Sequence, residues 1–221
     1  MREFDLETFL PRFLKALTET AIMVSVSFVV ASVIGVLLAL WLYASRPGNI
    51  LENRVVYAVI NFIINLIRPV PFIIVAIAVV GLTRLIFGTG LGPLAATLPL
   101  SIVASVAIAR VIESNLVAVD PGAVEAASAM GAGPLRVLFT VVIPEALGPI
   151  TLGLTYIIVA LVDASAVAGA IGAGGLGYLA LNYGWARFDY TVIVIVVITL
   201  VVLVQGLQAV GNRIARAVMH A

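Results

Sequence analysis

The chain has 221 residues, of which 63% are hydrophobic and only 10% are charged, and its mean hydropathy is +1.23. Soluble domains are about 45–50% apolar and about 25% charged, so this composition excludes an ordinary water-soluble domain and indicates a membrane protein. The formal net charge of +1, without a basic patch, gives no reason to expect a nucleic-acid partner, and the lack of cysteine excludes disulfides, iron–sulfur clusters and Cys-ligated zinc.

Residues 1–17 mix acidic and basic side chains and contain Pro11, which does not match a cleavable signal peptide. The first long apolar stretch, residues 18–43, is therefore expected to insert into the membrane and to remain there. A helix of ~20 apolar residues is long enough to cross the ~30 Å hydrocarbon core of a bilayer. Ser45 to Gly48 then form a turn rich in helix-breaking residues.

The next apolar stretch, residues 55–87, is too long for one helix perpendicular to the membrane, and Pro69 and Pro71 divide it. We expect residues 55–67 to form a helix at the membrane interface. The spans that we expect, from the first to the fifth, are residues 18–43, 71–86, 94–112, 149–171 and 190–210, followed by an amphipathic tail. The sequence thus predicts an all-α, polytopic membrane domain over residues 1–221.

An odd number of spans places the two termini on opposite sides of the membrane. Cytoplasmic loops are enriched in Lys and Arg. One set of loops holds Arg46, Arg54, Arg68, Arg110, Arg136, Arg213 and Arg216, and the other holds Arg2, Arg12, Lys15, Arg84 and Arg187. The first set is the better cytoplasmic candidate, so we expect the N-terminus outside, the C-terminus in the cytoplasm, and residues 113–145 on the cytoplasmic side.

Several kinds of chemistry lack the residues they need. His220 is the only histidine, and a His-dependent nucleophile or metal site is therefore not expected. The only lysine, Lys15, does not belong to a P-loop, so ATP hydrolysis is not expected in this chain. Residues 172–177 match G-x-G-x-x-G, but no strand is predicted before them, and we interpret them as a glycine-rich helix end or re-entrant turn. No cofactor is expected.

The polar interruption at residues 113–145 contains signals for two short helices. Asp120 is a suitable N-cap and Pro121 suits the first helical position, so a helix is predicted over residues 123–130. Gly131 can adopt the left-handed conformation that ends a helix. A second helix is predicted over residues 135–142, and Pro144 with Glu145 would start a new one. A merely solvated loop would not need two capped helices.

This interruption resembles the "EAA" loop of ABC importer permeases, whose pattern is EAA-x3-G-x9-I-x-L-P. Glu125, Ala126, Ala127, Gly131 and Pro144 stand in the corresponding places, whereas the two apolar positions before the proline hold other apolar residues: Val141 and Ile143. The segments RPVPFIIV (68–75), ARVIESNL (109–116) and GAIGAGGLGYLALNYG (169–184) look most like the methionine-importer branch of this family.

The resemblance implies a permease subunit that translocates methionine or a similar small amino acid by alternating access. The implied partners are two copies of a cytoplasmic ABC ATPase, a second copy of this chain, an extracytoplasmic substrate-binding lipoprotein and the lipid bilayer of the bacterial inner membrane. In the family, the EAA loop is a coupling helix that docks in a groove of the ATPase. The implied coupling residues are Asp120, Glu125, Ala126, Ala127, Gly131 and Pro144.

Three other functions stay open at the level of sequence. Permeases for osmoprotectants or phosphonates share the EAA loop and part of the glycine cluster. An ion-coupled carrier acting alone usually shows internal repeats and an even number of helices, and neither is found here. A structural subunit without transport is a weaker alternative, because the fourth span contains a polar residue.

Two features of the fourth span are candidates for packing and for the translocation path. Small residues recur every four positions, which permits close approach of another helix, either in a second copy or within one subunit. With the nearby glycines, these packing or gate candidates are Ala160, Ala164, Ala168, Gly172, Gly174, Gly175 and Gly177.

Asp163 is the only aspartate within an expected span, and Ser165 follows two positions later. A carboxylate at mid-membrane costs about 2.5–3.5 kcal/mol on insertion scales, so we expect Asp163 to face protein or a water-filled cavity. The family pattern does not require an acid at this position. Asp163 and Ser165 are therefore candidate residues of the translocation path, and the alternative is an uncharged Asp163 hydrogen-bonded to a neighbouring helix.

Overall fold

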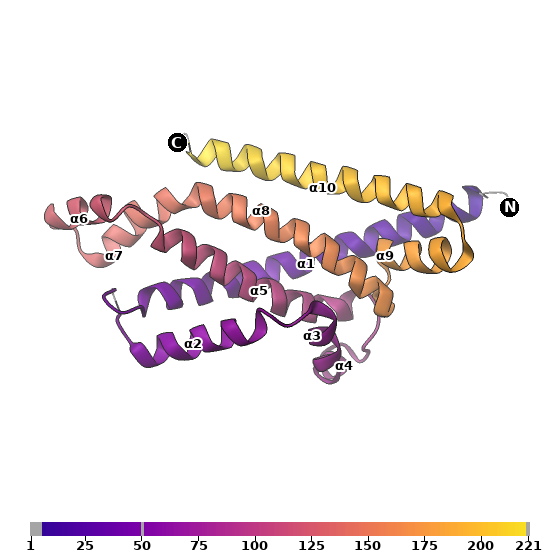
Figure 1. The fold of residues 1–221 in the computed structure, drawn as a ribbon, viewed down its shortest axis with the longest axis horizontal. Coiled ribbons are helices and arrows are strands. Elements are labelled where there is room, and N and C mark those ends of the chain that lie inside the picture. The colour runs from indigo at the N-terminus through magenta and orange to yellow at the C-terminus, as the bar shows by residue number, and fades with distance from the viewer. Residues whose placement is uncertain (1–5, 50, 220–221) are drawn as a thin grey trace. The chain divides into compact units, whose positions relative to one another are not determined.

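The computed structural model describes residues 6–49 and 51–219, and within them the chain is helical and contains no β-strand. His220 lies outside the described residues. The α-helices, labelled in Figure 1, are α1 (Leu6–Ala44), α2 (Arg54–Ile67), α3 (Phe72–Ala78), α4 (Val80–Phe87), α5 (Pro93–Val117), α6 (Pro121–Ala129), α7 (Pro134–Val137), α8 (Ile143–Ala168), α9 (Gly175–Leu179) and α10 (Tyr190–Met219). Short π-helical or 3-10 segments connect some of them: Leu138–Val142, Gly169–Ala173, Ala180–Gly184 and Trp185–Arg187.

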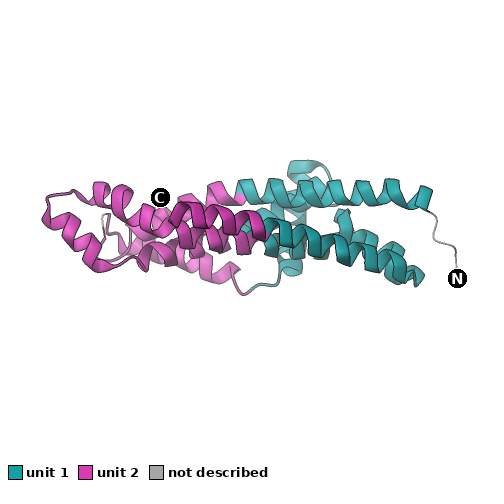
Figure 2. Cartoon of the chain, turned by 90° about the horizontal axis from the view of Figure 1, so that it is seen from above, with its two compact units in different colours: residues 1–30, 70–104, 158–207 teal, residues 31–69, 105–157, 208–221 magenta. Residues whose placement is uncertain are grey.

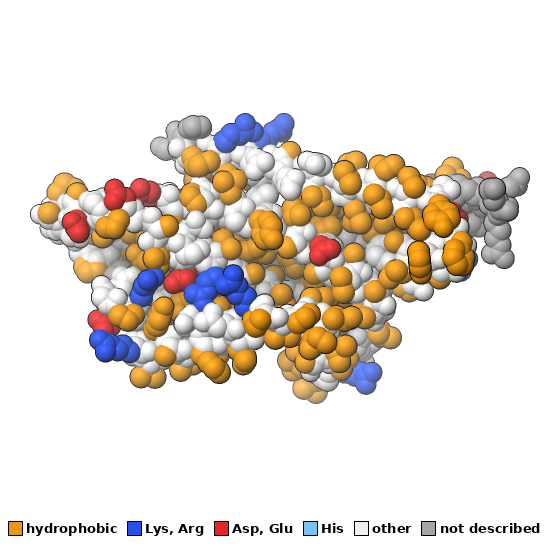
Figure 3. Space-filling model, in the orientation of Figure 1, with side chains coloured by type: hydrophobic (Ala, Val, Ile, Leu, Met, Phe, Trp, Pro, Cys, Tyr) orange, Lys and Arg blue, Asp and Glu red, His pale blue; other side chains and the backbone are white. Residues whose placement is uncertain are grey.

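Four helical stretches in the described part of the chain are long and apolar enough to cross a membrane. They are Leu6–Ala44, Pro93–Val117, Pro134–Ala173 and Tyr190–Met219, and they contain the first, third, fourth and fifth expected spans. Hydrophobic side chains cover much of the surface visible in Figure 3, as expected for a protein that faces lipid. The expectation of an all-α, polytopic membrane protein is confirmed.

The second expected span differs in the structure from one straight helix. Residues 71–86 form two short helices, α3 and α4, which meet at Val79 with φ −94° and ψ 4°. Sixteen residues at ~1.5 Å each extend only about 24 Å, less than the ~30 Å core. Instead, α2 and α3 together are long and apolar enough for a fifth span, but they are bent by 106° at the Pro69–Pro71 break.

The prediction that a new helix starts at Pro144 is wrong. Helices α7 and α8 are joined without a break by the π-helical residues Leu138–Val142. Pro144 has no backbone N–H and cannot make the usual bond to the carbonyl four residues earlier, and a π-turn widens the helix at such a place. Glu145 therefore does not lie at a free helix N-terminus.

The chain divides into two compact units, coloured separately in Figure 2. Unit 1 comprises residues 1–30, 70–104 and 158–207, and unit 2 comprises residues 31–69, 105–157 and 208–221. A buried cluster in unit 1 consists of Phe9, Ala16, Leu176, Leu179, Val192 and Val196, from α1, α9 and α10. A buried cluster in unit 2 consists of Leu42, Ile64, Val106 and Ala109, from α1, α2 and α5. Each unit thus gathers segments that are distant in the sequence.

Candidate functional site

The short helix α6 is closed at both ends by the residues that the sequence singles out. The Asp120 Oδ1 atom accepts a hydrogen bond of 3.0 Å from the Gly122 N–H, and Pro121 occupies the first helical position. At the other end, Gly131 adopts φ +83° and donates its N–H to the Ser128 carbonyl at 2.9 Å. A side-chain N-cap stabilises a helix by about 1 kcal/mol. The predicted cap and the predicted left-handed glycine are confirmed.

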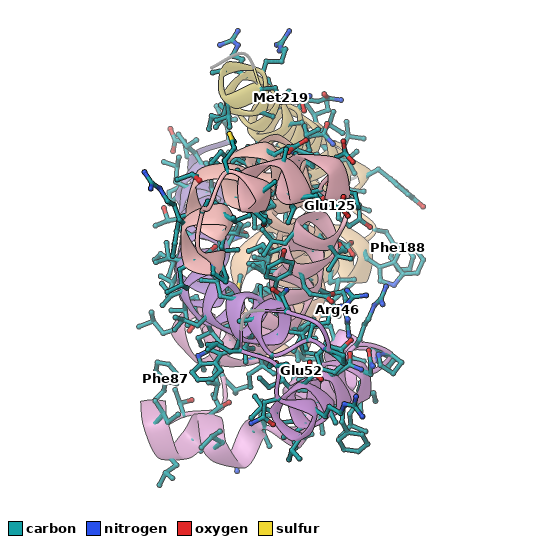
Figure 4. All side chains as sticks on the ribbon, turned by 90° about the vertical axis from the view of Figure 1, so that its left-hand side faces the viewer. Arg46, Glu52, Phe87, Glu125, Phe188 and Met219 are labelled. Carbon is teal, nitrogen blue, oxygen red and sulfur yellow. The ribbon has the colours of Figure 1, made fainter. Side chains whose placement is uncertain are left out.

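Helix α6 leaves most of its surface uncovered by its own chain. Glu125, labelled in Figure 4, and Ala126 are exposed, whereas Ala127 is buried. Glu125 forms no ion pair with any other residue that the structure describes. The small alanine side chains permit a partner to approach the helix backbone closely. The helix therefore presents an exposed surface of small side chains and one acidic group.

Three large apolar side chains next to α6 are also exposed, and they were not among the predicted site residues. Met130 is 82% exposed, Leu135 is 61% exposed and Phe139 is 62% exposed. They follow α6 directly in the chain, before the apolar part of α8. An aromatic or Met side chain in such a position is typical of a protein interface. The sequence could have indicated these residues, because large apolar side chains are not needed in a loop that only faces water at the membrane surface.

A buried charged network lies in unit 2, where α5 leads towards α6. Glu113 is 5% exposed, and its carboxylate pairs with Arg46 at 3.6 Å and with Arg110 at 3.1 Å. The Arg110 Nη2 atom also donates to the amide oxygens of Asn61 at 2.7 Å and Asn65 at 2.9 Å. The network thereby connects the turn after α1, helix α2 and the end of α5.

From the sequence, Arg46 and Arg110 predicted only the membrane topology, and the network was not predicted. A usable signal existed in the spacing of Arg110 and Glu113, which places both on one helix face at the polar end of an apolar helix. The contribution of Asn61 and Asn65 could not be foreseen, because it depends on the packing of α2 against α5.

The glycine cluster forms the sharp turn between α8 and α9. Gly172, Gly174 and Gly175 have φ of +99°, +86° and +78°, a conformation that other residues strongly disfavour. Residues of α1 hold the turn, since the Gly175 N–H donates to Glu19 at 2.7 Å and the Leu176 N–H donates to Thr20 at 2.9 Å. In a dinucleotide site, backbone N–H groups of this kind would bind a phosphate, but here those of Gly175 and Leu176 are already bonded to α1. The geometry therefore favours the predicted turn.

Gly177 allows α9 to pack directly on α8. A Cβ atom at this position would collide with the backbone of Ala166, and one at Gly169 would lie 2.6 Å from the Tyr178 nitrogen. Both glycines therefore permit contact between backbones.

Within the described residues, no group of three or more His, Cys, Asp or Glu side chains could hold a metal ion.

The small-residue stripe of α8 does not lie on one uniform face of unit 1. Ala160 is exposed, Ala164 and Gly172 are half-buried, and Ala168 is 1% exposed. Positions four apart in an α-helix differ by about 40° in direction, so such a stripe winds around the helix. Ala168 thus packs within its own chain, and only the first two alanines remain available to a second copy.

The structure does not bring Asp163 and Ser165 together. Asp163 is exposed, whereas Ser165 is buried and donates to the Val162 carbonyl at 2.7 Å. Two positions correspond to about 200° around a helix, which puts the side chains on opposite sides. Asp163 makes no hydrogen bond or ion pair with another described residue, and Ala160 and Val167 flank it on the same exposed face.

Residues 31–218 match the family described as "Binding-protein-dependent transport system inner membrane component". The chain belongs to this family. As an inner membrane component of this kind, it is a transport subunit, and it resides in the membrane with several helices.

The similar proteins of this family cover nearly the whole chain. The probable D-methionine transport system permease protein MetI of Vibrio cholerae is 40% identical over 207 residues, which are 94% of this chain and 92% of that protein. The methionine import system permease protein MetP of Bacillus subtilis is 36% identical over 80% of each chain. A solved structure of the MetNI methionine ABC transporter in an inward-facing conformation matches with a TM-score of 0.91 and 38% identity, covering 97% of this chain and 99% of that one. The resemblance inferred from the EAA loop is confirmed.

Proposed function

We propose that this inner membrane component is the permease subunit of an ATP-driven ABC importer for methionine or a similarly small amino acid. The observation that carries the proposal is α6, a helix capped by Asp120 and Gly131 that exposes Glu125 and Ala126 between two apolar helices. It belongs to a chain 40% identical to the probable D-methionine permease of Vibrio cholerae. ATP hydrolysis takes place in a separate cytoplasmic ABC ATPase, present in two copies.

In this proposal, α6 is the coupling helix that enters a groove of the ATPase. Its caps stabilise a helix that is otherwise too short to be stable by itself. Ala126 and Ala127 keep the side chains small, and Glu125 offers a charge to a basic group of the partner. Met130, Leu135 and Phe139 supply an exposed apolar surface beside it. Pro144 acts by requiring the π-turn that joins α7 to α8.

Coupling requires that a displacement of α6 reaches the membrane helices. The ion pairs of Glu113 with Arg46 and Arg110 hold the end of α5 to the turn after α1, and the asparagines of α2 hold Arg110. We infer that this network makes α5 move with its neighbours when the ATPase subunits close. The movement exchanges an inward-open for an outward-open cavity.

The remaining partners follow from the same proposal. A second copy of the chain completes the translocation path, and an extracytoplasmic substrate-binding lipoprotein delivers the amino acid. The N-terminus lies outside and the C-terminus in the cytoplasm, in agreement with the excess of arginine on the loops assigned to the cytoplasm. Asp163 lies on the exposed face of α8, which in this arrangement faces the path or the second copy.

The test is co-expression of the chain with an ABC ATPase and an extracytoplasmic binding protein of the same organism. We expect the ATPase to copurify with the permease, and we expect ATP-dependent uptake of radiolabelled methionine into proteoliposomes that contain the complete complex. Unlabelled small apolar amino acids should compete. A permease that purifies alone and transports without ATP would instead indicate an ion-coupled carrier, and uptake of betaine or a phosphonate in place of amino acids would change the substrate class.

A further inference from the structure

Unit 1 contains a pocket with charged side chains in its lining, to which the proposed coupling mechanism gives no role. The cavity has a volume of about 370 Å³ and lies among α1, the start of α5, the glycine turn and α9. Its polar and charged lining comes from Arg12, Lys15, Glu19, Tyr178 and Tyr183, together with the backbone of Gly172 to Gly175. Small-molecule sites in proteins typically occupy ~300–1,000 Å³, so the cavity is large enough for a small solute.

Two arginines lie over the ring of Tyr183, a residue that lines this pocket. The Arg12 guanidinium lies 4.9 Å from the centre of the Tyr183 ring, and the Arg187 guanidinium lies 4.5 Å from it. Neither arginine forms an ion pair with another residue that the structure describes. Lys15, one turn after Arg12 on α1, pairs with Glu19 only at 3.8 Å, and its side chain is 77% exposed. Two cations thus line the pocket and a third, Arg187, contacts its Tyr183, whereas the lining contains one carboxylate.

The single carboxylate is fixed in position by the backbone. Glu19 accepts the Gly175 N–H at 2.7 Å through Oε2, and its side chain is 19% exposed. Its Oε1 atom is left with only the long contact to Lys15. A carboxylate oxygen accepts more than one hydrogen bond, so Glu19 retains capacity for a donor placed in the cavity. The pocket therefore offers separate positions for a negative and a positive group.

We propose that this pocket binds a small zwitterionic amino acid. Its carboxylate meets Arg12 and Lys15, because a guanidinium donates two parallel hydrogen bonds to a carboxylate. Its ammonium group meets Glu19, and its side chain lies against the rings of Tyr178 and Tyr183. This inference rests on the proposed function for the class of solute, and it adds a site separate from Asp163 of α8.

The position of the pocket in the chain indicates which side of the membrane it serves. Arg12 and Lys15 precede the most apolar part of α1, and Arg187 lies three residues before the start of α10. The buried cluster of Phe9, Leu176 and Val192 packs these helix ends together within unit 1. With the N-terminus outside, the pocket opens on the extracytoplasmic side. It is then a site where the solute is held before it enters the translocation path.

Thiol labelling tests the pocket directly, because the chain contains no cysteine. Tyr178→Cys places one thiol in the lining, and Leu85→Cys on α4, at an 82% exposed position that does not line the pocket, is the matched control. Both variants are purified with their ATPase in nanodiscs of zwitterionic lipid. We expect methionine to slow maleimide labelling of the Tyr178→Cys variant and not of the Leu85→Cys variant. The decarboxylated analogue 3-(methylthio)propylamine should not protect, since it lacks the carboxylate.

Removal of the cations should weaken the protection. In the Tyr178→Cys background, the double substitution Arg12→Gln and Lys15→Gln should raise the half-protective methionine concentration about 10-fold or more, as expected for a lost charge-assisted hydrogen bond. Arg84→Gln, which changes a basic residue of α4 outside the pocket, should leave it unchanged. If methionine protected the thiol equally well with and without the Arg12→Gln and Lys15→Gln substitutions, the assignment would be overturned.

Failure of this inference can be told from failure of the proposed function. If methionine does not slow labelling while the same complex imports methionine, the pocket assignment is wrong and the proposed function stands. If methionine protects but no amino acid is imported, the pocket assignment stands alone. Protection by phosphatidylglycerol without added amino acid would assign the cations to a lipid headgroup and would also overturn the proposal.

Discussion

The Glu113 carboxylate lies 3.1 Å from the Arg110 guanidinium, one turn away on the same helix, and both groups sit where α5 leaves its apolar stretch. The pair is almost completely shielded on the glutamate side, since the Glu113 side chain is 7% exposed. Arg46 from the turn after α1 contacts the other carboxylate oxygen at 3.6 Å. The end of α5 that leads to α6 is thereby fixed to two other segments of unit 2.

Glu113→Ala should strongly destabilise the permease. The substitution leaves Arg110 and Arg46 without their carboxylate, but their side chains are 22% and 41% exposed, so the cost should lie below the about 3–5 kcal/mol typical of a fully buried pair. Glu113→Gln retains the shape of the side chain and one hydrogen-bond acceptor, so the stability of this variant should fall less. The control is Glu52→Ala, whose pair with Arg54 at 3.5 Å is exposed and should be worth less than about 1 kcal/mol. Thermal unfolding of the purified complex measures the difference, and equal effects of the two alanine substitutions would contradict the buried network.

Gly131→Val should uncouple transport without unfolding the protein. The substitution forces a β-branched residue to φ +83°, which should displace the end of α6. We expect membrane-inserted permease that assembles poorly with its ATPase and transports little. Gly133→Val is the matched control, because Gly133 has φ −66° and ψ 157°, which valine adopts readily. Copurified ATPase and methionine uptake are the measurements. Normal assembly of the Gly131→Val variant would show that α6 does not dock through this end.

Gly177→Ala should destabilise the α8–α9 turn. The added Cβ would collide with the Ala166 backbone, which cannot move away as a flexible side chain could. Overpacking of this kind costs about 1–3 kcal/mol. Gly206→Ala in α10 provides the opposite case, because its Cβ meets no other atom within 4 Å and alanine favours a helix by about 0.5–1 kcal/mol. The unfolding temperatures of the two variants should therefore shift in opposite directions.

Asp163→Asn should slow uptake or change substrate choice while assembly and basal ATPase activity are retained. Asn keeps the shape of the side chain and removes the charge from the exposed face of α8. A charged group is costly against lipid, so its exposure in the single chain indicates that a second copy or water covers this face in the membrane. Uptake is measured from pH 5.5 to 8. Unchanged rate and selectivity across this range would assign Asp163 a structural role only.

Much of the fold followed from local sequence. Four expected spans lie within long apolar helices, because the length and hydropathy of a transmembrane helix are properties of one continuous segment. The cap at Asp120 and the left-handed Gly131 were also predictable, since helix ends are set by residues within one turn of each other. The EAA spacing was sufficient to predict the family.

Other features depended on the tertiary structure. The π-turn before Pro144 and the division of residues 71–86 into α3 and α4 depend on how the backbone accommodates a proline or a short segment among its neighbours. Asp163 and Ser165 are two positions apart, but only the packing of α8 shows that one is exposed and the other buried.

What the sequence determined by itself is the family, the apolar helices and the two capped ends of α6, because each is encoded by residues close together in the chain. The tertiary structure alone decided the pairing of Glu19 with Gly175, which are 156 residues apart, and the contact of Arg110 with Asn61 across 49 residues. It also brought Arg12 and Arg187 to the same tyrosine ring. Polar contacts between distant segments have no local periodicity, and they form only once the membrane helices have packed against one another.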